Sequence, residues 1–136
     1  MRDILKLARI QIIICVLFVI CKAWFRPFIL DRDFHVIFDI IVLSLPNFFE
    51  SIVGVLSLTY IGLYLNHRFV KAGEKIKDKH LYLLATLLAA IFVLTQEFKI
   101  HNLGGNNVYD PYDVLFSIIG LSAGFAIVWK MQPKYD

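Results

Sequence analysis

Three carboxylate side chains, Glu50, Glu97 and Asp113, stand at the ends of long apolar segments. If consecutive segments cross a membrane in alternating directions, Glu50 begins one crossing, Glu97 ends the next and Asp113 begins the last, so all three lie at the same level. Ionisable groups inside a membrane bundle are costly and commonly mark a site for a ligand, a proton or a cation. The sequence therefore predicts that the three carboxylates converge at one end of a helical bundle.

Neighbouring polar residues extend this predicted site. We expect Tyr109 and Asp110 to lie over the carboxylates. Three carboxylates cannot all stay charged at close range in a poorly solvated pocket. We therefore expect either that a cation, Lys22, Arg26 or His101 compensates them, or that at least one of them stays protonated near neutral pH. The competing interpretation is structural: each carboxylate is hydrated just above the hydrocarbon, or stabilises the first turn of a helix as Asp113 can.

Two other chemistries can be weighed on the same residues. Glu97 with His101, and Asp110 with Asp113, offer oxygen and nitrogen ligands for a hard cation or zinc. The glycines and asparagines of 104–107 are ordinary turn residues, however, and Asp110 before a proline is an ordinary helix start. We therefore assign no metal and no cofactor.

The sequence contains no recognisable catalytic motif. The serines have no Gly-x-Ser-x-Gly setting, and no His-Glu-x-x-His motif or phosphate-binding loop occurs. We therefore do not expect an enzyme.

The elements that position these residues are predicted to be membrane-spanning helices. Of the 136 residues, 59% are hydrophobic and only 18% are charged, against about a quarter charged in soluble domains. A spanning helix needs about 20 mostly apolar residues, and such segments occupy approximately 8–26, 47–65, 80–98 and 113–130. Pro27 is expected to end the first of them. We predict an all-α fold: a four-helix transmembrane bundle, formed by residues 1–136 as a single integral membrane domain.

The apolar segment 34–45 is too short to join these four spans. Its twelve residues would cover about 18 Å as a helix, well below the roughly 30 Å of a hydrocarbon core, and Asp39 would lie in its middle. We expect an additional short helix that is interfacial or re-entrant, ended at Pro46 and Asn47 by a turn or a kink.

Small residues indicate the faces on which the predicted spans meet. Small side chains let helices approach closely, most clearly in the pattern small-xxx-small. In the second and fourth spans they share a helical face with a predicted site carboxylate: Gly54, Ser117, Gly120 and Gly124. We therefore expect these residues to lie at helix contacts and the carboxylates to face the interior of the bundle.

Lysine and arginine residues are distributed unequally over the predicted loops. Ten of them lie in the N-terminus, the 66–80 loop and the C-terminus, and four lie on the opposite side. The positive-inside rule therefore predicts that both termini are cytoplasmic. The formal net charge of +3 is accounted for by this asymmetry and by the anionic inner leaflet. The expected partner is the lipid bilayer, and no nucleic acid is expected.

The C-terminal part of the chain, mainly residues 95–125, resembles VanZ-like proteins, a family of small four-span bacterial membrane proteins. The matching positions are a carboxylate that ends the penultimate span, an acidic residue after a polar loop, and a last span opened by Asp and containing Gly-x-x-x-Gly: Glu97, Asp110, Asp113, Ser117, Gly120 and Gly124. The chain differs from the family in having no arginine after Arg68 and a serine in place of a small amide at 117. The resemblance implies a bacterial inner-membrane protein of the cell envelope, in a family linked to glycopeptide-antibiotic tolerance.

Two functions remain open at this point. In the first, the carboxylates bind an envelope lipid, a cell-wall precursor or a cation at the outer face. In the second, the bundle is an accessory structural subunit of a larger membrane complex, or forms a homo-oligomer, and the carboxylates hold helices together. The twelve phenylalanines slightly favour the second function, in which aromatic side chains pack against a protein partner. The short loops also leave few residues from which a binding site could form.

Overall fold

The computed structural model describes residues 2–100 and 109–135, and every regular element in these ranges is helical. The elements, in chain order, are α1 (Arg2–Ile20), the π-helix η1 (Cys21–Phe25), α2 (Arg26–Leu30), α3 (Val36–Phe69), α4 (Asp78–Glu97) and α5 (Pro111–Met131). Four continuous helical segments are long and apolar enough to cross a membrane: α1 to α2, α3, α4 and α5. The predicted all-α fold with four such helices is confirmed.

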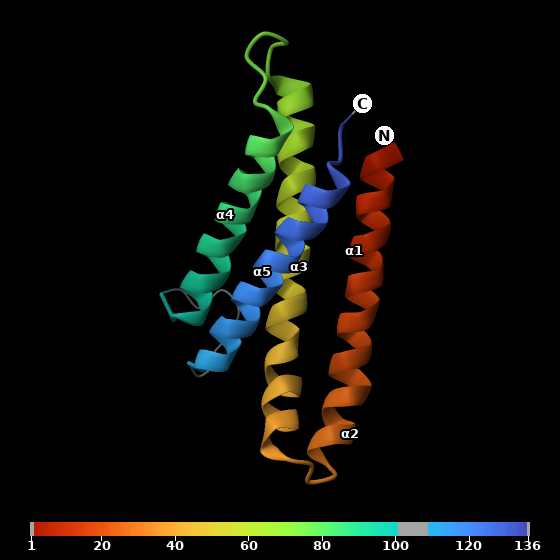
Figure 1. Cartoon of the computed structure of the whole chain (residues 1–136), viewed down its shortest axis with the longest axis vertical. Coiled ribbons are helices and arrows are strands. Elements are labelled where there is room, and N and C mark those ends of the chain that lie inside the picture. The colour runs from red at the N-terminus through yellow and green to blue at the C-terminus, as the bar shows by residue number, and fades with distance from the viewer. Residues whose placement is uncertain (1, 101–108, 136) are drawn as a thin grey trace.

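α3 is the central helix of the bundle. α1 lies along one side of it, α4 along the other, and α5 packs across it (Figure 1). The buried core follows one face of α3, with Ile52, Val55, Leu56 and Leu63 packed against residues of the other helices. Outside this core many of the exposed side chains of the spans are large and apolar, as expected when lipid replaces water as the surrounding solvent.

The segment 34–45 is not the separate short helix that its length predicts. α3 begins at Val36 and continues through Pro46 to Phe69. Its buried positions keep helical spacing across the proline, from Val42 and Ser44 to Ser51 and Val55, so one continuous face packs on the bundle. Neighbouring helices can stabilise a proline-containing span in this way. At 34 residues, α3 is about 51 Å long, well beyond the roughly 30 Å hydrocarbon core.

Pro27 does not end the first helix either. The π-helix η1 accommodates Pro27 within a continuous helix. The Arg26 backbone N–H donates to the carbonyl of Cys21, five residues earlier, and α2 then continues to Leu30. The extra residue in this wide turn shifts the hydrogen-bond register just where proline lacks a donor and would clash with the preceding turn. The first helix is therefore longer than predicted.

Both described ends of the chain lie at the same end of the bundle as the loop between α3 and α4 (Figure 1). The turn between α2 and α3, and the ends of α4 and α5 that carry Glu97 and Asp113, face the other way. The hairpin formed by α2 and the start of α3 extends beyond the ends of α4 and α5. The two ends of the molecule are therefore built from different parts of the chain.

Candidate ligand-binding cavity

A cavity of about 260 Å³ lies between α3, α4 and α5. Glu50 from α3 and Glu97 from α4 both line it, as does Ser117 from α5. Leu58 on α3 and Phe92 on α4 add apolar surface to its lining. We call this space the carboxylate cavity. It brings together two of the three predicted carboxylates, from the consecutive helices α3 and α4, which pack against each other.

Ser117 provides a buried hydrogen-bonding group in the carboxylate cavity. Its side chain is 0% exposed, and in the described part of the chain its Oγ has no hydrogen-bond partner. Burying a hydroxyl without a partner costs free energy, so this atom is available to a bound group.

Asp113 lies next to the carboxylate cavity. The side chains of Ser44 and Asn47, both on α3, lie beside its carboxylate. Asn47 also lines the cavity and so connects Asp113 with it. Glu97 is close enough to Asp113, Glu50 and Asp110 for all of these charges to interact. The predicted acidic cluster is therefore present at this end of the bundle.

Two lysines supply positive charge to the cluster. Lys22 interacts electrostatically with Glu50, as one of the predicted charge partners. Lys99, which was not among the predicted charge partners, interacts with both Glu97 and Asp113. Arg26, the second predicted partner, has no described interaction with the carboxylates, and the third, His101, lies outside the described residues.

The end of α4 explains how Lys99 reaches the carboxylates. The Lys99 N–H donates to the Gln96 carbonyl at 3.1 Å and the Ile100 N–H donates to the Thr95 carbonyl at 2.9 Å. With Lys99 in the left-handed region at φ 60°, these two bonds form a Schellman motif. The motif reverses the chain directly after Glu97 and keeps the lysine near the cluster.

Tyr109 and Asp110 lie at the start of α5. The Asp110 carboxylate caps the helix by accepting the Tyr112 N–H at 2.9 Å, and Pro111 follows in the first turn. The Tyr109 ring stacks on Phe98, with 6.1 Å between the ring centroids. Asp110 thus combines the ordinary helix-start role with a charge that acts on Glu97 and Asp113.

The small residues of α5 lie against α3. A Cβ at Gly120 would overlap the Phe48 carbonyl oxygen, and a Cβ at Gly124 would lie 3.0 Å from the Cβ of Val55. Gly54 faces α4 with more space, since its added Cβ would lie 3.8 Å from the Cβ of Ala89. The close approach of α5 to α3 places Ser117 and Asp113 beside the polar residues of α3.

Sequence reasoning missed several polar residues around the cavity. Pro46 and Asn47 predict a turn or a kink, but the position of Asn47 three residues before Glu50 puts both on one face of a helix. Gln96 also lines the cavity. The Gln11 side chain donates to the Ser57 Oγ at 2.8 Å, which ties α1 to α3 at the cavity wall. The feature of the sequence that could have identified these residues is that they are polar side chains inside apolar spans.

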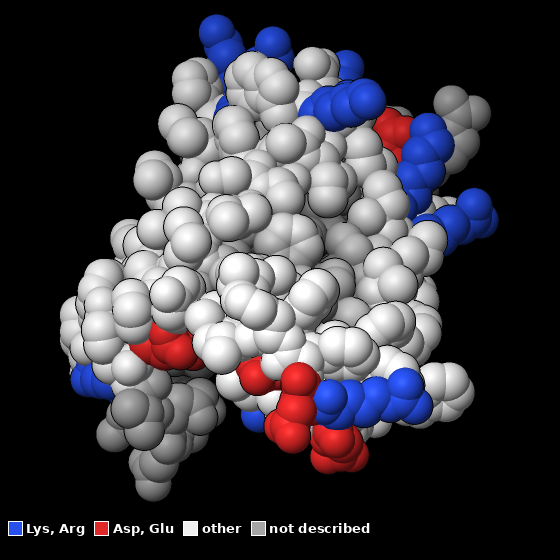
Figure 2. Space-filling view, turned by 60° about the horizontal axis from the view of Figure 1, so that its bottom comes forward, with Lys and Arg blue, Asp and Glu red and all other residues white. Residues whose placement is uncertain are grey.

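Acidic side chains gather at this end of the molecule, whereas basic side chains crowd the opposite end of the visible face (Figure 2). The arrangement can attract and hold a positively charged group through two carboxylates, with amide and hydroxyl groups completing its hydrogen bonds. Within residues 2–100 and 109–135, no three His, Cys, Asp or Glu side chains are grouped to hold a metal ion. Comparison of the chain with protein-family models, with curated proteins and with solved structures returned no match.

Proposed function

We propose that this chain is a multi-pass protein of a bacterial inner membrane whose carboxylate cavity binds the cationic group of an envelope component. The observation that carries the proposal is that Glu50, Glu97 and the fully buried Ser117, from three different helices, line one cavity. Charged groups between spans are retained despite their cost when they serve a ligand. The role is binding, without catalysis.

The lining of the cavity favours an ammonium group attached to an apolar chain. The carboxylates would pair with the ammonium, and Leu58 and Phe92 would pack against carbon atoms. At about 260 Å³ the cavity is smaller than the roughly 300–1,000 Å³ of pockets for drug-sized ligands. It therefore suits a headgroup rather than a whole lipid or a cell-wall precursor.

The orientation that we propose places both termini in the cytoplasm and the carboxylate cavity toward the outer face. It is supported by the ten basic residues at the end with the termini, against four at the cavity end. The resemblance to VanZ-like proteins supports an envelope role, since the matching residues include Glu97 and Asp113, whose charges interact.

The proposal can be tested with octylammonium as a probe and octanol as its uncharged counterpart, added to the purified full chain in nonionic detergent. We expect octylammonium to raise the unfolding temperature, because a ligand that binds only the folded state stabilises it, and octanol to have no such effect. The Glu50→Gln/Glu97→Gln variant should lose the response, since it keeps the size of both side chains and removes their charge.

Glu74→Gln is the control for the Glu-to-Gln change itself, because Glu74 lies exposed in the loop at the opposite end. It should respond to octylammonium like the unmodified protein. An equal response of the Glu50→Gln/Glu97→Gln variant would contradict the proposal and leave the carboxylates with a structural role.

A second candidate function, accessory subunit of a larger membrane complex, is favoured by the protruding hairpin of α2 and the start of α3. Phe28, Phe34 and Phe38 form a row of neighbouring rings, with centroids 6.4 and 6.1 Å apart, and all three are exposed. The Trp24 side chain nearby is 75% exposed. The mass of the particle purified in mild detergent distinguishes the two functions, because a stable hetero-complex supports the subunit role.

A further inference from the structure

A second, larger cavity lies at the opposite end of the molecule, between the start of α4 and the end of α5. Its volume is about 610 Å³. Three lysines and three large apolar side chains contribute to its lining: Lys77, Lys79, Lys134, Leu83, Phe125 and Trp129. We call it the basic groove. It shares no residue with the carboxylate cavity.

The basic groove is held together by specific contacts. α5 ends at Met131, and the left-handed conformation of the next residue, Gln132, at φ 44° turns the chain toward α4. There the buried Tyr82 hydroxyl donates to the Pro133 carbonyl at 2.7 Å. This bond places the next residue, Lys134, at the groove. The Lys79 ammonium lies over the Trp129 ring, 5.3 Å from its centroid.

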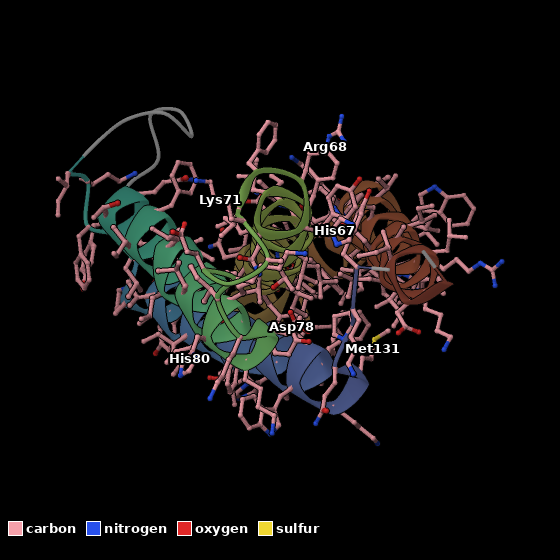
Figure 3. All side chains as sticks on the ribbon, turned by 90° about the horizontal axis from the view of Figure 1, so that it is seen from above. His67, Arg68, Lys71, Asp78, His80 and Met131 are labelled. Atoms are coloured by element: carbon pink, nitrogen blue, oxygen red, sulfur yellow. The ribbon has the colours of Figure 1, made fainter. Side chains whose placement is uncertain are left out.

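Within residues 2–100 and 109–135, no acidic side chain forms an ion pair with a lysine of the groove. Asp78 is the one carboxylate among the groove residues. It lies on the side of α4 toward α3 and the C-terminal segment, whereas His80 points outward (Figure 3). In the part of the chain that the structure describes, no ion pair joins Asp78 to Lys77, Lys79 or Lys134. The groove therefore keeps an excess of positive charge.

The combination of charge and apolar surface defines the ligand. Ammonium groups attract phosphate oxygens, and tryptophan is the residue most typical of the boundary between headgroups and hydrocarbon. Leu83 and Trp129, 49% and 44% exposed, provide an apolar surface that a small inorganic anion would not use. The groove also lies at the helix ends, where headgroups are found if these helices span a bilayer.

We propose that the basic groove binds an anionic phospholipid, with its phosphate between Lys77, Lys79 and Lys134 and its first methylenes against Trp129 and Leu83. This site would attach the cytoplasmic end of the bundle to the inner leaflet, independently of what the carboxylate cavity binds.

Tryptophan fluorescence tests the proposal directly. The chain has two tryptophans, so the Trp24→Phe variant reports on Trp129 alone. We expect phosphatidylglycerol with brominated acyl chains to quench Trp129 at a concentration about tenfold lower than brominated phosphatidylcholine requires, both titrated into the full chain in nonionic detergent. Equal quenching by the two lipids would overturn the proposal.

The lysines are tested by two matched double variants in the same background. Lys79→Gln/Lys134→Gln removes two charges from the groove, and Lys71→Gln/Lys130→Gln removes two charges from exposed positions at the same end that do not line it. The first should abolish the tenfold preference, and the second should change it by less than about twofold. Equal losses in both would show diffuse attraction and overturn the site. Competition by inorganic phosphate at matched ionic strength would show a small-anion site, and would equally overturn a lipid site.

Discussion

Asp110 combines two roles that single substitutions can separate. Its carboxylate caps α5 through the Tyr112 N–H, and its charge acts on Glu97 and Asp113. Asparagine caps a helix about as well as aspartate does, whereas alanine does not. Substitutions at this position therefore separate the effect of the capping hydrogen bond from the effect of the negative charge.

We predict that Asp110→Ala lowers the free energy of unfolding by about 1 kcal/mol, through loss of the cap, and that Asp110→Asn lowers it much less. Denaturant unfolding of the detergent-solubilised variants, followed by circular dichroism, measures both. Both variants should bind octylammonium more weakly than the unmodified protein, because each lacks the negative charge. Equal destabilisation by the two substitutions would instead assign the stabilising effect of Asp110 to its charge on the helix dipole.

Among the elements, the pair α3 and α5 determines whether the carboxylate cavity exists. The backbones approach so closely at Gly120 that any side chain there would meet the Phe48 carbonyl and the Ser51 Cβ. Ser117 lies one turn before Gly120 on the same face of α5 and lines the cavity. Separating the two helices would therefore also displace a wall of the proposed site.

We predict that Gly120→Ala destabilises the bundle by about 1–3 kcal/mol, the usual cost of overpacking, and weakens octylammonium binding. Gly62→Ala is the matched control on α3, because a Cβ at Gly62 meets nothing within 4 Å, and it should leave both properties essentially unchanged. Thermal unfolding in detergent, monitored with and without the probe, gives both quantities. If Gly120→Ala proved as harmless as Gly62→Ala, the close approach of α5 to α3 would not be required for the fold.

For the whole molecule, the two ends have opposite chemistry. The carboxylate cavity and its acidic neighbours lie at one end, and the basic groove lies at the end that carries the 70–77 loop and both described chain ends. Each proposed ligand is matched to its end by charge: a cationic group at the end that we propose faces outward, and an anionic lipid at the end that we propose faces the cytoplasm. Both proposals therefore use the same orientation in the membrane.

We predict that an impermeant maleimide added to intact cells labels an Asp33→Cys variant and does not label a Gly73→Cys variant, both made in a chain with Cys15 and Cys21 replaced by serine. Asp33 lies in the turn between α2 and α3 and Gly73 in the loop between α3 and α4, and both are exposed. Permeabilised cells serve as the control, in which both variants should react. The reverse pattern in intact cells would invert the orientation and exchange the leaflets assigned to the two sites.

The local properties of the sequence were sufficient for the four apolar helices. The prediction that Glu50 begins a span was wrong, because α3 begins at Val36 and Glu50 lies inside it. α4 and α5 begin and end within two residues of their predicted bounds, because their apolar segments match the length of a membrane and are flanked by polar residues. The sequence also predicted that the face of α5 with Gly120 and Gly124 lies at a helix contact, since small residues at helical spacing permit close packing whatever the partner helix is.

Only the tertiary structure decided what happens at the prolines and which side chains meet. Pro46 and Pro27 would end isolated helices, but packing on the bundle and the wide turn of η1 allow both helices to continue. Because α3 continues, Ser44 and Asn47 face Asp113, and because a Schellman motif reverses the chain, Lys99 returns to Glu97. Such contacts depend on the relative rotation of helices that are far apart in the chain, and spacing within a single helix does not determine which residues of another helix it meets.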